Sequence, residues 1–146
     1  MTQEDKILLL KDLCARLPYG VKCQETEIWY SAGHEIEKVN TVTLEASSLE
    51  KDYYMFYKPY LFPLSSLTKE QRNIISNKLK EIQINNPPFG KIHDSGTDNL
   101  LNNITLCAQW LINYYDENHL DHRRLIEKGL AINAQDYPNI YNDYDK

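Results

Sequence analysis

The chain has 146 residues, which is room for one domain of ordinary size. Apolar residues make up 42% of it and charged residues 25%, close to globular averages, which excludes wholesale disorder. The 16 basic and 21 acidic residues leave a net charge of −5, which argues against the whole surface binding nucleic acid.

Membrane and export signals are not visible. The apolar runs are far shorter than the roughly 20 residues that a membrane helix needs. The first residues are acidic, whereas a secretory signal starts with basic residues. We therefore expect a cytoplasmic protein.

Three cysteines occur, and they are far apart along the chain: Cys14, Cys23 and Cys107. Their odd number and spacing disfavour a disulfide framework or a zinc site, so we expect reduced thiols and no metal. Cys14 and Cys107 lie on apolar helix faces, where a thiol fills space. Cys23 lies among polar neighbours and is the one candidate for reactivity.

The first element is predicted to be a helix over residues 3–17. Thr2 can cap this helix, with Asp5 at the third position of an imperfect capping box. Apolar residues follow at helical spacing until residues 18–20, Pro-Tyr-Gly, end the pattern.

Three extended segments are predicted next, over residues 21–30, 41–46 and 52–57. Residues 31–33 form the turn between the first two segments. Proline cannot donate to a central ladder, so Pro59 is expected to close the third. The pattern predicts an antiparallel meander.

Helices are predicted for most of the remaining chain. Thr68 opens a capping box for the second helix. The third, over residues 97–117, has apolar residues at alternating spacings of four and three. A short helix over residues 121–128, capped by Asp121, is expected to end in a Schellman motif at Gly129.

These elements predict one α+β domain over residues 1–134. It would have a small antiparallel sheet of about three to four strands, packed by an N-terminal helix and two to three C-terminal helices. Residues 135–146 are polar and acidic, which predicts a tail that can be disordered.

The glutamates are concentrated in the predicted sheet. Residues 24–50 contain six glutamates and one lysine, which favours either docking of a basic partner or simple solubility. Most aromatic residues there are expected in the core, but tyrosines exposed beside the glutamates would form a protein-binding patch. The candidate partner-binding residues are Glu25, Glu27, Trp29, Tyr30, Glu35 and Glu37.

A polar cluster near the C-terminus offers an alternative. Its candidate ligand-binding residues are His119, His122, Arg123 and Arg124. Guanidinium groups suit a phosphate or a carboxylate, so this cluster could bind a nucleotide or another small ligand. Imidazoles also suit a metal ion, but a helix end between the two histidines disfavours a metal site. The plain alternative is a solvated junction in which Arg123 pairs with Glu127.

No catalytic motif is present. The patterns GxSxG, HExxH and GxGxxG are all missing from the sequence, so nothing in it favours an enzyme. We expect a non-enzymatic protein with no catalytic residue and no cofactor. A hydrolase built around the two neighbouring histidines is the weakest of the alternatives.

Three segments carry a resemblance to other proteins: LPYGVKC at 17–23, KPYLFPLSSL at 58–67, and HLD followed by LIEKGLA within 119–131. They resemble small uncharacterised proteins of Bacteroidales genomes and of their phages or mobile elements. Arg124 stands where that group leads us to expect a glycine. The group has no established activity, so it transfers no site residue.

The resemblance implies an accessory protein of a phage or mobile element that acts in the host cytoplasm. Together with the acidic sheet, it predicts a protein that binds another protein. Modulation or inhibition of a host defence complex is one concrete form of this function. A homodimer is left open, as is small-ligand binding by the histidine and arginine cluster.

Overall fold

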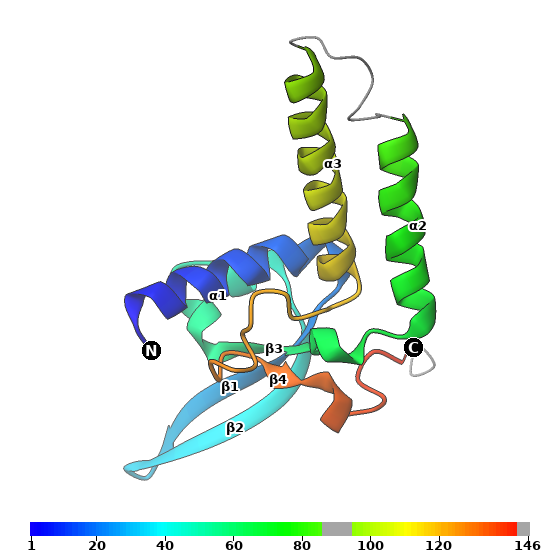
Figure 1. Ribbon diagram of the computed structural model, residues 1–146. Helices are drawn as coiled ribbons and strands as arrows, with labels where there is room; N and C mark the ends of the chain where they lie inside the picture. Colours follow the sequence, from blue (N-terminus) through cyan, green and yellow to red (C-terminus); the bar gives the residue numbers. More distant parts are fainter. Residues whose placement is uncertain (86–94, 143–146) are drawn as a thin grey trace. The chain divides into compact units, whose positions relative to one another are not determined.

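The computed structural model describes residues 1–85 and 95–142, which fall into two compact units (Figure 1). Unit 1 combines the described residues of 1–64 and 116–146, and unit 2 is Ser65–Tyr115. The predicted α+β class is confirmed, because these described residues form a four-stranded sheet, an N-terminal helix and two further helices.

Helix α1 (Gln3–Arg16) begins at the predicted capping box. The Thr2 hydroxyl accepts a hydrogen bond from the Asp5 N–H at 3.1 Å, and the Asp5 carboxylate accepts one from the Thr2 N–H at 3.4 Å. Leu9 and Leu13 on this helix are buried in the core against the sheet. The helix therefore covers one face of the sheet.

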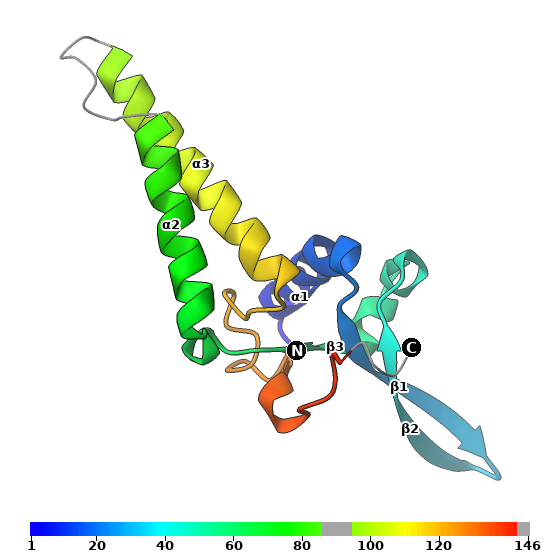
Figure 2. The same ribbon diagram turned by 90° about the vertical axis from the view of Figure 1, so that its right-hand side faces the viewer.

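Strands β1 (Lys22–Ser31) and β2 (His34–Thr43) form a long antiparallel hairpin (Figure 2). Its two-residue turn, Ala32 and Gly33, has φ angles of 51° and 80°, the left-handed conformation of a type I′ turn. β2 is longer than the predicted segment 41–46. Its first half was missed because those residues are exposed on both faces and show no apolar alternation.

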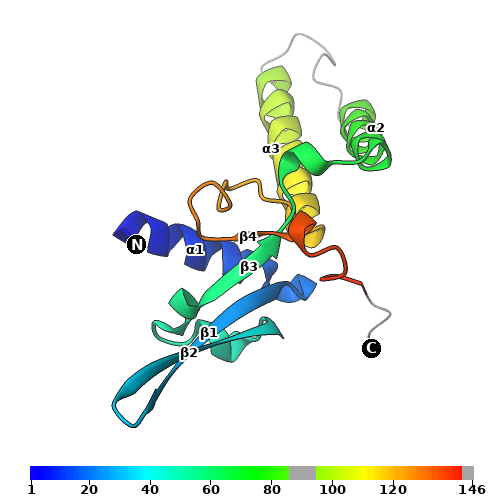
Figure 3. The ribbon, with the colours of Figure 1, turned by 90° about the horizontal axis from the view of Figure 1, so that it is seen from below.

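Strand β3 (Tyr57–Leu61) lies beside β1, and β4 (Ile132–Asn133) completes the order β2-β1-β3-β4 (Figure 3). β3 is antiparallel to β1 over its first three residues and parallel to β4 over its last two. The predicted meander is therefore wrong. Pro59 does not close the strand but lies buried within β3, at the residue where β3 changes neighbours.

The segment predicted as the third strand, residues 52–57, forms the 3₁₀ helix η3 (Tyr53–Phe56) before β3 begins. Backbone N–H groups here donate to carbonyl groups three residues earlier and not to a neighbouring strand. Residues three apart in a 3₁₀ helix share one side. Tyr53 and Phe56 are accordingly both exposed, while Tyr54 is buried in the core.

Residues 121–128 do not form the predicted helix, although Asp121 does cap this segment. Its carboxylate accepts hydrogen bonds from the N–H groups of Leu125 at 2.8 Å and Ile126 at 2.9 Å. Arg124 has a φ of 61°, in the left-handed region. A left-handed residue cannot continue a right-handed helix, so the turns do not extend.

The predicted Schellman pattern at the end of this segment is nevertheless present. Gly129 has a φ of 71°, its N–H donates to the Ile126 carbonyl at 3.1 Å, and the Leu130 N–H donates to the Leu125 carbonyl at 2.9 Å. Leu125 and Leu130 both belong to the buried core. The motif therefore fixes two core leucines without a helix preceding it.

Part of the predicted tail packs against the sheet. The ring of Tyr137 meets that of Tyr60 edge-on, with centroids 5.1 Å apart. The Tyr141 hydroxyl donates to the Tyr60 carbonyl at 2.6 Å, and this ring stacks on His119 at 4.0 Å. Residues 143–146 lie outside the described chain.

Unit 2 contains α2 (Lys69–Asn85) and most of α3 (Ser95–Glu117), and α3 lies close to its predicted range of residues 97–117. The predicted capping box of α2 is confirmed: the Thr68 hydroxyl accepts from the Gln71 N–H at 3.1 Å, and the Gln71 side chain accepts from the Thr68 N–H at 2.9 Å. Among the residues that the structure describes, no helix combines the length and apolarity needed to cross a membrane.

Arg124→Gly should stabilise the protein by up to about 1 kcal/mol, because glycine adopts the left-handed conformation without the steric cost that arginine bears. Arg124→Ala removes the same exposed side chain but keeps the steric cost of the left-handed conformation, because alanine has a Cβ atom. It is therefore the matched control, and it should not stabilise the protein. Urea denaturation measures both free energies of unfolding. A loss of stability in the glycine variant would show that this backbone conformation is not strained.

Candidate functional site

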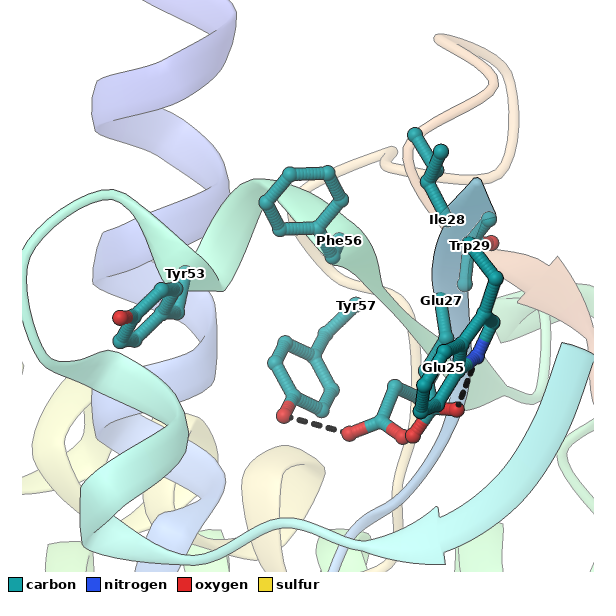
Figure 4. A pocket seen from close by; sticks show the side chains of 8 residues that line it. Glu25, Glu27, Ile28, Trp29, Tyr53, Phe56 and Tyr57 are labelled. Atoms are coloured by element: carbon teal, nitrogen blue, oxygen red, sulfur yellow. Dashed lines mark hydrogen bonds between the residues drawn. The ribbon is translucent and has the colours of Figure 1, made fainter. Parts of the chain in front are cut away.

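A hollow of about 400 Å³ lies between β1 and η3 in unit 1 (Figure 4). We call it the acidic–aromatic groove. The side chains that give it this character are Glu25, Glu27, Trp29, Tyr53, Phe56 and Tyr57. The groove thus joins two carboxylates to four aromatic rings.

The geometry of β1 places three of these side chains together. Glu25, Glu27 and Trp29 are two residues apart, so all three point to one face of the strand. Further back on the same face, Cys23 is buried in the core that α1 covers. The groove is therefore the part of this face that extends beyond the core, and η3 borders it.

Each carboxylate of the groove is oriented by an aromatic donor. The Tyr57 hydroxyl donates to Glu25 Oε2 at 2.7 Å, and the Trp29 indole Nε1 donates to Glu27 Oε2 at 3.1 Å (Figure 4). The hydrogen bond from Tyr57 lowers the pKa of Glu25, with smaller contributions from Glu27 and Asn40, so Glu25 is ionised at neutral pH. Burial, followed by this same hydrogen bond, raises the pKa of Tyr57.

The aromatic walls of the groove are open to solvent. Trp29 is 57% exposed, Tyr53 52% and Phe56 43%. Contiguous exposed aromatic surface of this kind is typical of binding sites on soluble proteins. An anionic, aromatic groove is chemically suited to a cation with an apolar stem.

The predicted partner-binding residues do not form one surface. Residues directly opposite in an antiparallel pair share a face, and Tyr30 pairs with Glu35 while Glu37 pairs with Ile28. Tyr30, Glu35 and Glu37 therefore point to the face of the hairpin opposite to Glu25, Glu27 and Trp29, and none of the three lines the groove. Only the other half of the predicted set, on the face of Glu25, lines the groove.

The second predicted cluster is largely internal. His122 and Arg123 belong to a buried ion cluster in unit 1, together with three residues that are not among the predicted ligand-binding residues. The buried ion cluster consists of Asp12, Arg16, Asp116, His122 and Arg123. Two guanidinium groups thus face two carboxylates.

Asp116 is the centre of this cluster. Arg123 Nη1 donates to Asp116 Oδ1 and to Asp12 Oδ1, each at 2.8 Å, and His122 Nε2 lies 2.9 Å from Asp116 Oδ1. Burial raises the pKa of Asp116, but the hydrogen bonds from His122 and Arg123 and the charges of Arg123 and Arg16 outweigh it and lower the pKa to about 2. Asp116 is therefore ionised at neutral pH.

Arg16 connects α1 to the segment after α3. Its Nε donates to Asp12 Oδ2 at 2.9 Å, and its Nη2 donates to the Leu120 carbonyl at 2.6 Å. Both Arg16 and Asp12 are completely buried. The expected pairing of Arg123 with Glu127 is wrong, because Arg123 bonds to Asp12, which is distant in the chain, and to Asp116, which lies seven residues before it.

His119 and Arg124 lie apart from this cluster's salt bridges. His119 stacks on Tyr141, and burial, followed by the charge of Arg16, lowers its pKa to about 4. Arg124 is exposed. The residues described in the structure include no group of three or more histidine, cysteine or acidic side chains that could hold a metal ion.

The sequence interpretation of the cysteines is wrong in two places. Cys23, the candidate for reactivity, is completely buried, whereas Cys14 is exposed. Burial, followed by the charge of Asp12, raises the pKa of the Cys23 thiol from its ordinary value of 9.0 to about 12. The alternation of β1 turns Cys23 into the core although its sequence neighbours are polar.

Comparisons of the chain with protein-family models, with curated proteins and with solved structures found no match.

Thiol labelling of the native protein should modify Cys14 rapidly and leave Cys23 unmodified until the protein unfolds. The raised pKa alone lowers the thiolate fraction of Cys23 by about a thousandfold, and burial adds a steric barrier. Peptide mapping by mass spectrometry after a short exposure to iodoacetamide identifies the labelled residue, and Cys14→Ala removes that label. Rapid native labelling of Cys23 would contradict the buried placement.

Asp116→Asn should cost about 3 kcal/mol at neutral pH, because two arginines lose a buried carboxylate. In the folded protein the pKa of Asp116 is about 2, below its ordinary value of 3.8. The carboxylate therefore contributes its full stabilisation above pH 3.8, and this contribution to the free energy of unfolding is lost as the pH falls toward 2. The difference in the free energy of unfolding between the unaltered protein and the Asp116→Asn variant should therefore become smaller from pH 5 to pH 2. A gap that stays constant would show that the charge of Asp116 is not the source of the stabilisation.

Proposed function

We propose that this protein is a non-enzymatic protein-binding module, and that the acidic–aromatic groove receives a basic segment of its partner. The observation that carries the proposal is the groove itself: two carboxylates held by aromatic donors, beside aromatic rings about half exposed. The segment of the chain that forms the hairpin and the groove is also where the glutamates are concentrated.

The exposed rings supply the energy for docking. Burial of apolar surface contributes roughly 25 cal/mol per Å², and aromatic side chains are the most frequent energetic centres of protein interfaces. Trp29, Tyr53 and Phe56 together offer such a centre in one place. Burial of these rings would stabilise the complex, because in the free protein they remain largely in water.

The charge of the hairpin selects the kind of partner. The net charge of −5 over residues 24–50 attracts a basic surface and repels an acidic one, nucleic acid included. Lys38 is the one basic residue of this segment, and it lies opposite Glu27 in the hairpin. By the same pairing rule Lys38 lies on the groove face, where its charge offsets part of the charge of Glu25 and Glu27.

The resemblance extends this proposal to a biological setting. An accessory protein of a phage or mobile element would act by occupying the basic surface of a partner, such as a component of a host defence complex. Small-ligand binding by the histidine and arginine cluster is less favoured, because His122 and Arg123 already bond to Asp116, and Arg123 also to Asp12.

Selection from a random peptide library against the immobilised protein tests this proposal. Selected peptides should be rich in basic residues, and Glu25→Gln with Glu27→Gln should weaken their binding by about tenfold or more, since two charged contacts are lost.

Glu35→Gln with Glu37→Gln is the matched control, because it removes the same charge from the opposite face of the same hairpin. It should weaken binding by less than about threefold. Equal losses in the two double variants would indicate general charge attraction without a groove. Selected peptides that lack basic residues would contradict the proposal outright.

A further inference from the structure

We infer that the groove takes the side chain of one arginine, stacked on the Trp29 indole and hydrogen-bonded to Glu25 and Glu27. This inference rests on the proposed function, because the arginine would belong to the basic segment of the partner. It specifies which cation the groove prefers and which atoms hold it.

The hydrogen bonds of the groove leave acceptor capacity on both carboxylates. A carboxylate has about four lone-pair sites. Glu25 uses one oxygen for the Tyr57 hydroxyl and also interacts with Asn40 and with Glu27, and Glu27 uses one oxygen for the Trp29 indole. The aromatic donors thus orient both carboxylates without saturating them, which is the state that a pre-organised anion pair needs to bind a cation.

The arrangement suits a guanidinium group better than an ammonium group. Glu25 and Glu27 project from the same face of one strand, two residues apart, so a planar group with several N–H donors can reach both. A guanidinium also stacks on an indole, and it is less strongly hydrated than an ammonium, which suits a partly apolar groove. Lysine offers a compact charge with no flat face.

The walls of the groove suit the stem of the same side chain. Phe56 and Tyr53 lie on one side of η3 and border the groove, where the methylene groups of an arginine can pack. The volume of about 400 Å³ lies within the range of about 300–1,000 Å³ typical of ligand sites. The residues that flank the arginine in the partner can therefore enter as well.

Blocked amino acids are the probes that test this inference without any partner protein. N-acetyl-arginine methylamide, the lysine equivalent and the trimethyl-lysine equivalent are titrated separately into the protein. Binding is followed by NMR at the indole N–H of Trp29. The chain has two tryptophans, so Trp110→Phe, in unit 2, identifies the Trp29 signal.

The arginine probe should shift the Trp29 signal saturably and bind about threefold or more tightly than the lysine probe. Glu27→Gln should abolish most of this difference, while Glu37→Gln, on the opposite face, should preserve it. Tyr57→Phe keeps the ring but removes the donor to Glu25, and it should weaken the arginine probe by several-fold. Unchanged amide spectra away from the groove confirm that each variant is folded.

Three results would overturn the arginine assignment. Tighter binding of trimethyl-lysine would show that the aromatic rings select a quaternary ammonium, and equal binding of lysine would show that charge alone matters. No shift of Trp29 with any probe, in a protein that still binds basic library peptides through Glu25 and Glu27, would refute the arginine pocket while the proposed function stands. Binding of the arginine probe without binding of any basic peptide would refute the proposed function instead.

Discussion

The fold of unit 1 depends on the buried ion pair between Asp12 and Arg16. These two residues lie on the core side of α1, and both are removed from water completely. Burial of charge is costly unless partners compensate it, so the pair requires Asp116 and Arg123 from the other end of unit 1. The cluster thereby joins α1 to the segment that follows α3, and that segment supplies β4 and the core leucines of the Schellman motif. With α1 fixed in this way, one face of the sheet has a defined inner part and a defined outer part.

The groove results from that division of the sheet face. The inner part of β1 packs Cys23 under α1, while the outer part continues with the same alternation beyond the core. The alternation then places the half-buried Glu25 and Glu27 and the exposed Trp29 in the groove. The 3₁₀ helix η3 supplies the second wall, because its period of three brings Tyr53 and Phe56 to one side. A single strand thus contributes to the core at one end and to a binding surface at the other.

Local signals in the sequence predicted the local structure well. The capping boxes at Thr2 and Thr68, the tight turn before β2 and the Schellman pattern at Gly129 all depend on residues close together in the chain. Contacts between residues far apart in the sequence could not be predicted in the same way. The pairing of β3 with β4 joins residues more than 70 positions apart, and nothing in the local pattern of either strand specifies it. The opposite charges of Asp12 and Arg16, four residues apart on the core stripe of a helix, were a signal that could have indicated the buried cluster.

For a similar reason, only three of the six predicted partner-binding residues line the groove. A period of two assigns alternate residues of a strand to opposite faces, but the sequence does not say which face the rest of the protein leaves open. The most direct test of the account is therefore a map of amide chemical-shift changes on binding of a selected arginine-containing peptide. The account predicts changes over residues 25–29 and 53–57, with little effect at Glu35 and Glu37. Changes centred on Tyr30, Glu35 and Glu37, with the groove residues unaffected, would show that the opposite face of the hairpin is the binding surface.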